Sequence, residues 1–131
     1  MKTLIVEDDF TSRVLMHEML KKYGAADIAV NGKEAFEAVR AAMDAGAPYD
    51  LICLDIMMPE MDGFEALNKI RELEESRGVL TPHGAKIVMT TALSELENVS
   101  EAFRGLCDSY LVKPIETRKL REELSTLGLT A

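Results

Sequence analysis

Polar side chains that could do chemistry stand at the ends of four short apolar runs in this chain. They are three carboxylates, a hydroxyl and an ammonium group, supplied by Asp8, Asp9, Asp55, Thr91 and Lys113. Carboxylates that lie close together repel one another unless a cation neutralises them. Because the donors are oxygens, with no histidine or cysteine beside them, the ion that fits best is Mg²⁺. The pattern therefore predicts a divalent-cation site.

Alternating strand and helix patterns position these side chains. Runs typical of strands buried on both faces alternate with longer segments in which apolar residues recur at helical spacing. Such units form an open parallel sheet with helices on both faces, and ligands bind beyond the carboxyl ends of its strands. The polar connection 74–84 is expected to be an exposed loop or, alternatively, a loop that contacts a partner. The expected strands are 3–6, 27–30, 51–54, 86–91 and 109–112, and the expected helices are 10–23, 31–46, 64–73, 96–103 and 120–127.

The length and net charge of the chain exclude several classes of function. The chain has 131 residues, 23 acidic and 15 basic, and a formal charge of −8. We expect one domain, 1–131, with no effector domain. The acidity argues against nucleic acid and anionic membranes as partners, and no apolar run approaches the ~20 residues of a membrane span. Cys53 and Cys107 lack disulfide or metal-site spacing, which favours reduced thiols in a cytoplasmic protein.

Four segments carry a resemblance to a known family. They are the acidic stretch 6–10, the segment 54–63 around Asp55, the hydroxyl segment 90–92 and the lysine segment 110–114. Together they resemble the receiver domain of two-component response regulators over essentially the whole chain, with 54–63 the most specific motif. The resemblance implies a flavodoxin-like, doubly wound α/β fold, in which a parallel sheet of order 2-1-3-4-5 carries helices on both faces.

The resemblance also implies roles for the acidic residues. Asp55 is the phosphoacceptor, and it supplies one oxygen to Mg²⁺. Asp9 binds the ion directly, and Asp8 binds it through a water molecule. The backbone carbonyl of Met57 is the remaining protein ligand. In phosphoryl transfer the protein contributes mainly in-line positioning and neutralisation of charge, which this set supplies.

Three further residues complete the implied catalytic and switching apparatus. The Lys113 ammonium neutralises phosphoryl oxygens, and the Thr91 hydroxyl donates a hydrogen bond to them. Ala92, the small residue after Thr91, belongs to the phosphate environment. Thr91 and Tyr110 form the switch: Thr91 turns toward the phosphoryl group, Tyr110 fills the vacated space, and the face of helix 4, strand 5 and helix 5 changes shape.

Two positions that vary within this family are apolar here. Met57 stands two residues after Asp55, and Leu93 stands two residues after Thr91. Polar side chains there could orient a water molecule for attack on an acyl phosphate, but thioether and alkyl groups cannot. We therefore expect slow loss of the phosphoryl group.

The resemblance implies protein partners on both sides of a phosphoryl transfer. A histidine kinase, a histidine phosphotransfer protein or a small phosphodonor supplies the phosphoryl group, and a downstream protein responds to it. The expected function is a stand-alone response regulator that promotes its own phosphorylation and dephosphorylation and is not a turnover enzyme. We expect a monomer, with a dimer on phosphorylation as an alternative.

Three other functions are alternatives to this one. A phosphohydrolase with an aspartyl-phosphate would need a second aspartate where Met57 stands. A flavin-binding electron carrier would need a Ser/Thr/Gly-rich phosphate loop after the first strand, where residues 7–9 are all acidic. A phosphate sink shares every site residue with the switch and differs only in its partners, so this alternative stays open.

Overall fold

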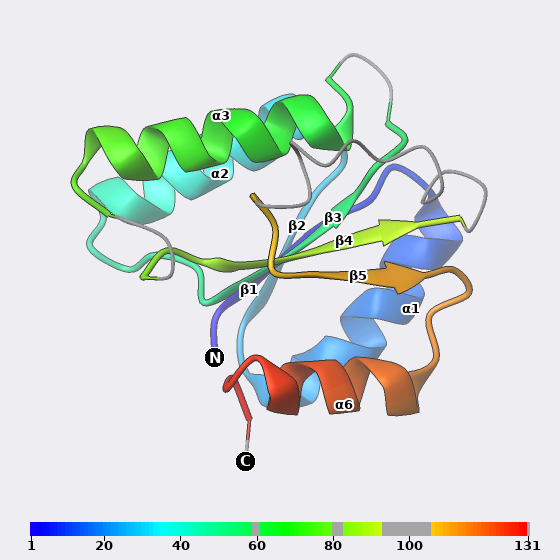
Figure 1. Cartoon of the computed structure of the whole chain (residues 1–131). Helices are drawn as coiled ribbons and strands as arrows, with labels where there is room; N and C mark the ends of the chain where they lie inside the picture. The colour runs from blue at the N-terminus through cyan, green and yellow to red at the C-terminus, as the bar shows by residue number, and fades with distance from the viewer. Residues whose placement is uncertain (59–60, 80–82, 93–105, 131) are drawn as a thin grey trace.

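Five parallel strands form one sheet in the computed structural model, which describes residues 1–58, 61–79, 83–92 and 106–130 (Figure 1). The order in the sheet is β2-β1-β3-β4-β5, and every neighbouring pair is parallel. The predicted strand order and direction are therefore confirmed. The strands are β1 (Thr3–Val6), β2 (Ala26–Ala29), β3 (Leu51–Asp55), β4 (Lys86–Thr91) and β5 (Ser109–Val112).

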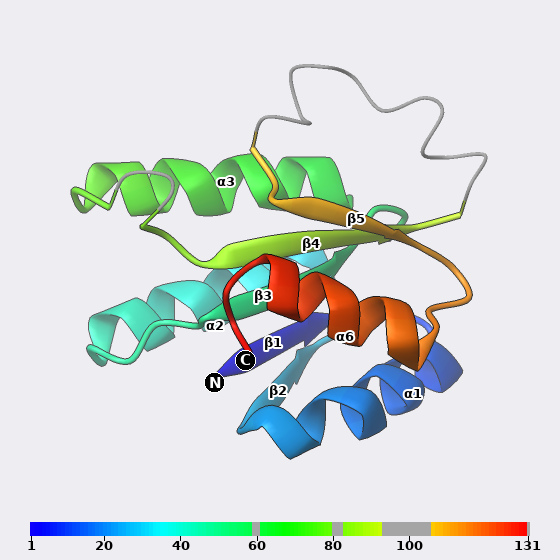
Figure 2. The same ribbon diagram turned by 60° about the horizontal axis from the view of Figure 1, so that its bottom comes forward.

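Helices cover both faces of the sheet. α2 and α3 lie on one face, and α1 and α6 lie on the other (Figure 1 and Figure 2). The predicted helix 96–103 lies outside the described residues. None of the helices within the described residues combines the length and apolar character that a membrane span requires. The described helices are α1 (Phe10–Leu20), α2 (Gly32–Asp44), α3 (Gly63–Ser76) and α6 (Thr117–Thr126), and a 3₁₀ turn at Lys21–Tyr23 follows α1.

Successive residues of the central strands point to opposite faces and build two cores. In β1, Leu4 and Val6 pack with α2 and α3, whereas Ile5 packs with α1 and α6. In β3, Ile52 faces the first core and Cys53 the second. All five side chains are at most 1% exposed. Burial on both faces explains why these strands read as continuous apolar runs, and Cys53 serves as a small core residue.

Side-chain caps fix where the helices that follow β2 and β3 begin. Asn31 accepts a hydrogen bond from the backbone N–H of Glu34 at 2.8 Å, and Asp62 accepts one from the N–H of Glu65 at 2.9 Å. The Glu34 carboxylate in turn accepts from the backbone N–H of Val30 at 3.0 Å. The bonds from Glu34 and Glu65 satisfy N–H groups that the first helical turn leaves unpaired, and the bond from Val30 joins the preceding residue to that turn. The two helices begin at Gly32 and Gly63, each within one residue of the start predicted from the sequence.

The predicted exposed loop over 74–84 starts too early, because α3 continues to Ser76, whereas residues 77, 78 and 83 beyond the helix are exposed as expected. α3 continues through Glu74, and Arg71 and Glu74 are only 8% and 5% exposed. Arg71 donates to the carboxylates of Glu74 at 2.7 Å and Asp108 at 3.0 Å. Glu74 also accepts from the backbone N–H of Ala85 at 2.8 Å. This buried network fastens α3 to the segments that lead into β4 and β5.

Candidate functional site

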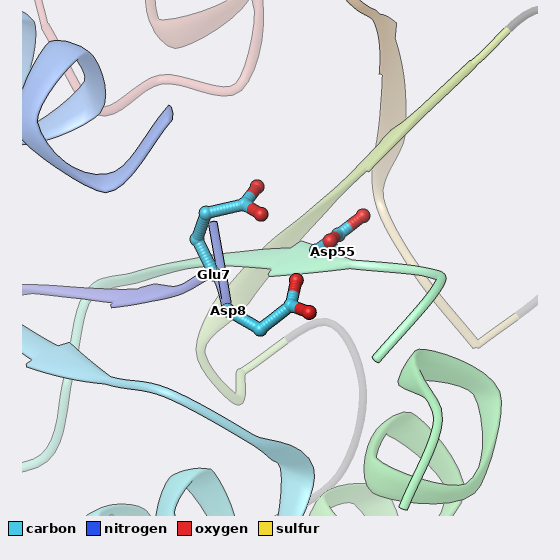
Figure 3. Close-up of side chains that lie close together, drawn as sticks. All are labelled: Glu7, Asp8 and Asp55. Atoms are coloured by element: carbon cyan, nitrogen blue, oxygen red, sulfur yellow. The ribbon is translucent and has the colours of Figure 1, made fainter. Parts of the chain in front are cut away.

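Three carboxylates gather at the carboxyl edge of the sheet (Figure 3). Glu7 and Asp8 directly follow β1, and Asp55 is the last residue of β3. One oxygen of each carboxylate lies within 4.8 Å of the others. Glu7 and Asp55 are each 3% exposed, whereas Asp8 is exposed. The structure thus brings Asp8 and Asp55 together as the sequence predicted, and it adds Glu7.

Glu7 takes the place in this cluster that we predicted for Asp9. Asp9 stands at the N-terminus of α1, where its Oδ2 accepts a hydrogen bond from the backbone N–H of Ser12 at 2.9 Å. This bond lowers the pKa of the Asp9 carboxyl group. The cluster found among the described residues contains Glu7 and Asp8 but not Asp9. The predicted acidic pair is therefore shifted by one residue. The helical pattern that starts at Phe10 was the available signal, because it makes Asp9 the natural N-cap.

Lys113 bridges two of the clustered carboxylates. It follows β5, and its backbone N–H donates to the carbonyl oxygen of Thr91 at 2.7 Å, which holds it beside the end of β4. Its Nζ donates to Oε2 of Glu7 at 2.8 Å and lies 3.3 Å from Oδ1 of Asp55. The predicted meeting of the ammonium group with Asp55 is present in the structure.

Burial and neighbouring charges shift the pKa values of the site. Burial raises the pKa of Asp55 to about 7, and the Glu7 carboxylate adds to this rise while Lys113 opposes it. Burial lowers the pKa of Lys113, but its contacts with Glu7 and Asp55 outweigh that effect and raise the pKa above its ordinary value. The lysine is therefore charged at neutral pH. Its single positive charge does not balance the three carboxylates of the cluster, so the charge of the site favours a further cation.

Thr91 and Tyr110 lie on neighbouring strands beside the cluster. Thr91 is fully buried, and its hydroxyl donates to the carbonyl oxygen of Ala92 at 3.0 Å. Tyr110 is half-buried against the core that β1 and β3 form with α2 and α3, and its hydroxyl oxygen is buried. Thr91 is thus inside the domain, whereas Tyr110 is partly exposed with its hydroxyl end buried. Leu93 lies outside the described residues.

The start of α3 holds the chain that follows Asp55. The N–H of Ile56 donates to the carbonyl of Thr90 at 3.1 Å, and the N–H of Gly63 donates to the carbonyl of Ile56 at 2.8 Å. A Cβ at Gly63 would lie 2.3 Å from the carbonyl oxygen of Asp55, so only glycine permits this approach. Met57 lies on this loop with 59% of its side chain exposed.

The cluster fits a bound Mg²⁺. Its members are carboxylates alone, with no histidine or cysteine among the described residues that make it up. Mg²⁺ prefers such hard oxygen donors and uses few carboxylates together with water. Burial and, after it, the neighbouring Glu7 carboxylate raise the pKa of Asp55, and a divalent cation would offset both effects by stabilising the ionised carboxylate.

A cavity of about 350 Å³ opens beside the cluster, between α1 and the connection from β5 to α6. The adjoining helix α1 exposes Phe10, Val14 and Leu15 by 70%, 44% and 55%. Large apolar side chains exposed together mark a surface suited to a partner. The cavity is lined by Glu7, Ser12, Leu15, Met16, Met19, Thr90, Lys113, Pro114 and Ile115.

The sheet order and the acidic edge with its lysine define a class of protein, the phosphoacceptor domains of two-component signalling. Residues 3–125 match the family model described as the response regulator receiver domain. The chain belongs to this family. The resemblance inferred from the sequence motifs is therefore confirmed.

Known relatives include both large kinases and small regulators. The chain is 42% identical over 122 residues to "Hybrid signal transduction histidine kinase B" of Dictyostelium discoideum, and 34% identical over 132 residues to "Probable histidine kinase 2" of Oryza sativa subsp. indica. The matches cover 88% and 93% of this chain but only 6% and 12% of those relatives. "Chemotaxis protein CheY" of Treponema pallidum is 34% identical, over 96% of this chain and 81% of its own length.

Solved structures share the fold over nearly the whole chain. The receiver domain of Ssk1 from Saccharomyces cerevisiae, solved with the histidine phosphotransfer protein Ypd1, matches with a TM-score of 0.80 and 26% identity, covering 98% of this chain and 88% of that one. TrrA from Thermotoga maritima, solved in complex with Mg²⁺-BeF, matches with a TM-score of 0.74 and 31% identity, covering 96% of this chain and 97% of that one.

Proposed function

We propose that Asp55 accepts a phosphoryl group and that this modification switches the binding of a partner protein. The observation that carries the proposal is the meeting of Asp55 with Lys113 at 3.3 Å inside an acidic cluster. The likeness to CheY over 81% of that protein's length supports action without an attached effector domain.

The proposed cation site uses the carboxylates of Glu7, Asp8 and Asp55 together with the backbone carbonyl of Met57. Glu7 replaces Asp9 in this set because Asp9 caps α1. A bound Mg²⁺ supplies charge neutralisation to the oxygens of the transferring phosphoryl group. The magnesium complex of TrrA, at 31% identity, supports this choice of ion.

The proposed reaction is an in-line transfer. One oxygen of the Asp55 carboxylate attacks phosphorus and forms a P–O bond. The P–N bond to a donor histidine breaks, and its electron pair leaves on the imidazole nitrogen. Lys113 lies 3.3 Å from Oδ1 of Asp55, close enough to stabilise charge on the phosphoryl oxygens.

The proposed switch runs through Thr91 and Tyr110. To donate to a phosphoryl oxygen, the Thr91 hydroxyl must give up its bond to the carbonyl of Ala92. Its movement changes the packing space beside β5, where Tyr110 lies. Such a change shifts the equilibrium between two packings of the same surface. A charged group added at one site alters partner binding in this way. Within the part of the chain that the structure describes, the surface formed by β5 and α6 would carry this change and contact a downstream protein.

The proposed phosphodonor is a histidine kinase or a histidine phosphotransfer protein. The exposed apolar side chains of Phe10, Val14 and Leu15 lie on the helix that lines the cavity beside the cluster. A helical donor with an apolar face could dock there and present its phosphohistidine to Asp55. The solved complex of Ypd1 with the Ssk1 receiver supports a partner of this kind.

Incubation with acetyl phosphate and MgCl₂, followed by intact-mass spectrometry, tests the phosphoacceptor. We expect one added phosphoryl group that hydroxylamine removes, absent from Asp55→Asn and present in Asp44→Asn, a change at an exposed aspartate on α2. An unmodified wild-type chain, or equal labelling of Asp55→Asn, would contradict the proposal.

A further inference from the structure

The two acidic residues after β1 share one site although they are neighbours in the chain. In an extended strand, adjacent side chains point to opposite faces of the sheet. Glu7 is buried and Asp8 is exposed, yet an oxygen of each lies within 4.8 Å of the other and of Asp55. The backbone therefore bends at Glu7 and Asp8. A contact outside the sheet is needed to stabilise this bend.

Arg13 contacts the backbone at this bend. Its Nη1 donates to the carbonyl oxygen of Glu7 at 3.3 Å and to that of Asp8 at 3.1 Å. The paired register of β1 ends at Val6, so both carbonyls lie beyond the sheet ladder. Nη1 carries two N–H groups, and one group can serve each carbonyl.

The position of Arg13 is itself fixed on two sides. Its backbone N–H donates to the carbonyl of Asp9 at 2.9 Å, in the first turn of α1. The ring centre of Phe10 lies 5.6 Å from its guanidinium carbon. This stacking favours a single orientation of the guanidinium group. Arg13 is thus half-buried, and these side-chain bonds go to the backbone carbonyls of the turn and not to its carboxylates.

We propose that Arg13 is a positioning residue that holds the backbone bend so that Glu7 and Asp8 both face Asp55. The role rests on the proposed function, because it concerns the cation site of that function. Two adjacent carbonyls fixed by one guanidinium group restrict the backbone torsions between them, and these torsions set where both carboxylates point.

Charge alone makes the opposite prediction. Removing a positive charge near a cation site lessens repulsion, so an electrostatic effect of Arg13 would tighten Mg²⁺ binding when the residue is neutralised. A positioning role predicts weaker binding instead. Arg13→Lys keeps the charge but offers a single ammonium point in place of the planar guanidinium fork.

Calorimetric titration with MgCl₂ separates these explanations. We expect Arg13→Met and Arg13→Lys to raise the Kd for Mg²⁺ roughly 3- to 10-fold, with thermal unfolding in EDTA close to that of wild type. Arg40→Met, which removes an exposed arginine paired with Glu37 on α2, makes the same charge change as Arg13→Met and should leave the Kd unchanged.

Each outcome of the titration has one meaning. Unchanged or tighter Mg²⁺ binding in both Arg13 variants would overturn the positioning role and leave the proposed function standing. A wild-type chain that binds no Mg²⁺ would overturn the cation site of the proposed function, and this role with it. Shifted amide resonances at Asp8 and Asp9 in the metal-free Arg13 variants would support the loss of the bend directly.

Discussion

The ammonium group of Lys113 lies 2.8 Å from Glu7 but 3.3 Å from Asp55. Without a phosphoryl group, the lysine therefore contacts the neighbouring glutamate more closely than the proposed phosphoacceptor. Because Glu7 also raises the pKa of Asp55, this one residue acts on both members of the reacting pair. The behaviour of Glu7 variants is consequently a direct test of the site.

Glu7 and Asp9 should differ in their importance for Mg²⁺ binding. Glu7→Gln removes a carboxylate of the cluster, and we expect the Kd for Mg²⁺ to rise about 10-fold or more, on the scale of other losses around metal sites. Asp9→Asn removes a charge outside the cluster, and asparagine still caps a helix, so its Kd should change less than about 3-fold. Calorimetry on the two variants measures this, and the reverse order would restore Asp9 as the ligand.

Ionisation of Asp55 should make the metal-free protein less stable as the pH rises. The pKa of Asp55 is about 7 in the folded chain against an ordinary value of 3.8. The folded state thus holds a proton that the unfolded state loses first, and this contribution to stability is present below pH 4 and disappears as the pH passes 7. Between pH 5.5 and pH 8 the free energy of unfolding should fall by roughly 2 kcal/mol from this group.

Asp55→Asn provides the control for this pH effect, because it removes the titrating carboxyl group with little change of shape. Urea unfolding in EDTA at pH 5.5 and pH 8 should show a smaller loss of stability in the variant than in wild type. Equal pH dependence in both proteins would show that groups other than Asp55 cause the change.

Arg71 should contribute far more to the free energy of unfolding than a surface arginine does. It is 8% exposed and contacts Glu74, Asp108 and the carbonyls of Leu106 and Ala85. Removing one partner of a buried ionic network leaves other charges uncompensated and costs about 3–5 kcal/mol. Arg71→Met should therefore lower the free energy of unfolding by that amount in urea titrations.

The matched control for Arg71 lies on the same helix end. Arg77 pairs with Asp44, and their side chains are 36% and 55% exposed. Exposed ion pairs contribute about 0–1 kcal/mol, so Arg77→Met should have a small effect. A similar loss in the two variants would mean that the network around Arg71 is not a special source of stability.

The sequence specified the central strands and Asp55 well, because β1 and β3 are buried on both faces and acidic residues stand where these strands end. The prediction placed the metal ligand at Asp9 rather than Glu7, although the helix predicted from residue 10 already made Asp9 the natural N-cap. The sequence carried no signal for Arg71 and Glu74, because charged residues on a helix are usually exposed and only the packing of α3 against β4 and β5 buries them.

Met57 should lengthen the lifetime of the phosphorylated state. Its side chain is 59% exposed on the loop after Asp55, and a thioether cannot orient a water molecule for in-line attack. Met57→Asn supplies an amide that can, so we expect phosphoryl loss to become several-fold faster. Intact-mass spectra taken over time after removal of acetyl phosphate measure the rate. An unchanged rate in Met57→Asn would contradict the prediction that the Met57 side chain slows loss of the phosphoryl group.

Gly63 should be essential to the geometry of the phosphoacceptor. A Cβ there would lie 2.3 Å from the carbonyl oxygen of Asp55 and 2.7 Å from Cα of Ile56, so Gly63→Ala must move the start of α3 away from β3. We expect a loss of about 1–3 kcal/mol in the free energy of unfolding and slower phosphorylation by acetyl phosphate. Gly46→Ala is the control, because Gly46 has φ of 72° with nothing within 4 Å of its added Cβ, and its strain lies away from the site. Gly46→Ala should therefore lower the free energy of unfolding without slowing phosphorylation. Equal phosphorylation rates in the two alanine variants would show that the contact between Gly63 and Asp55 does not position the carboxylate.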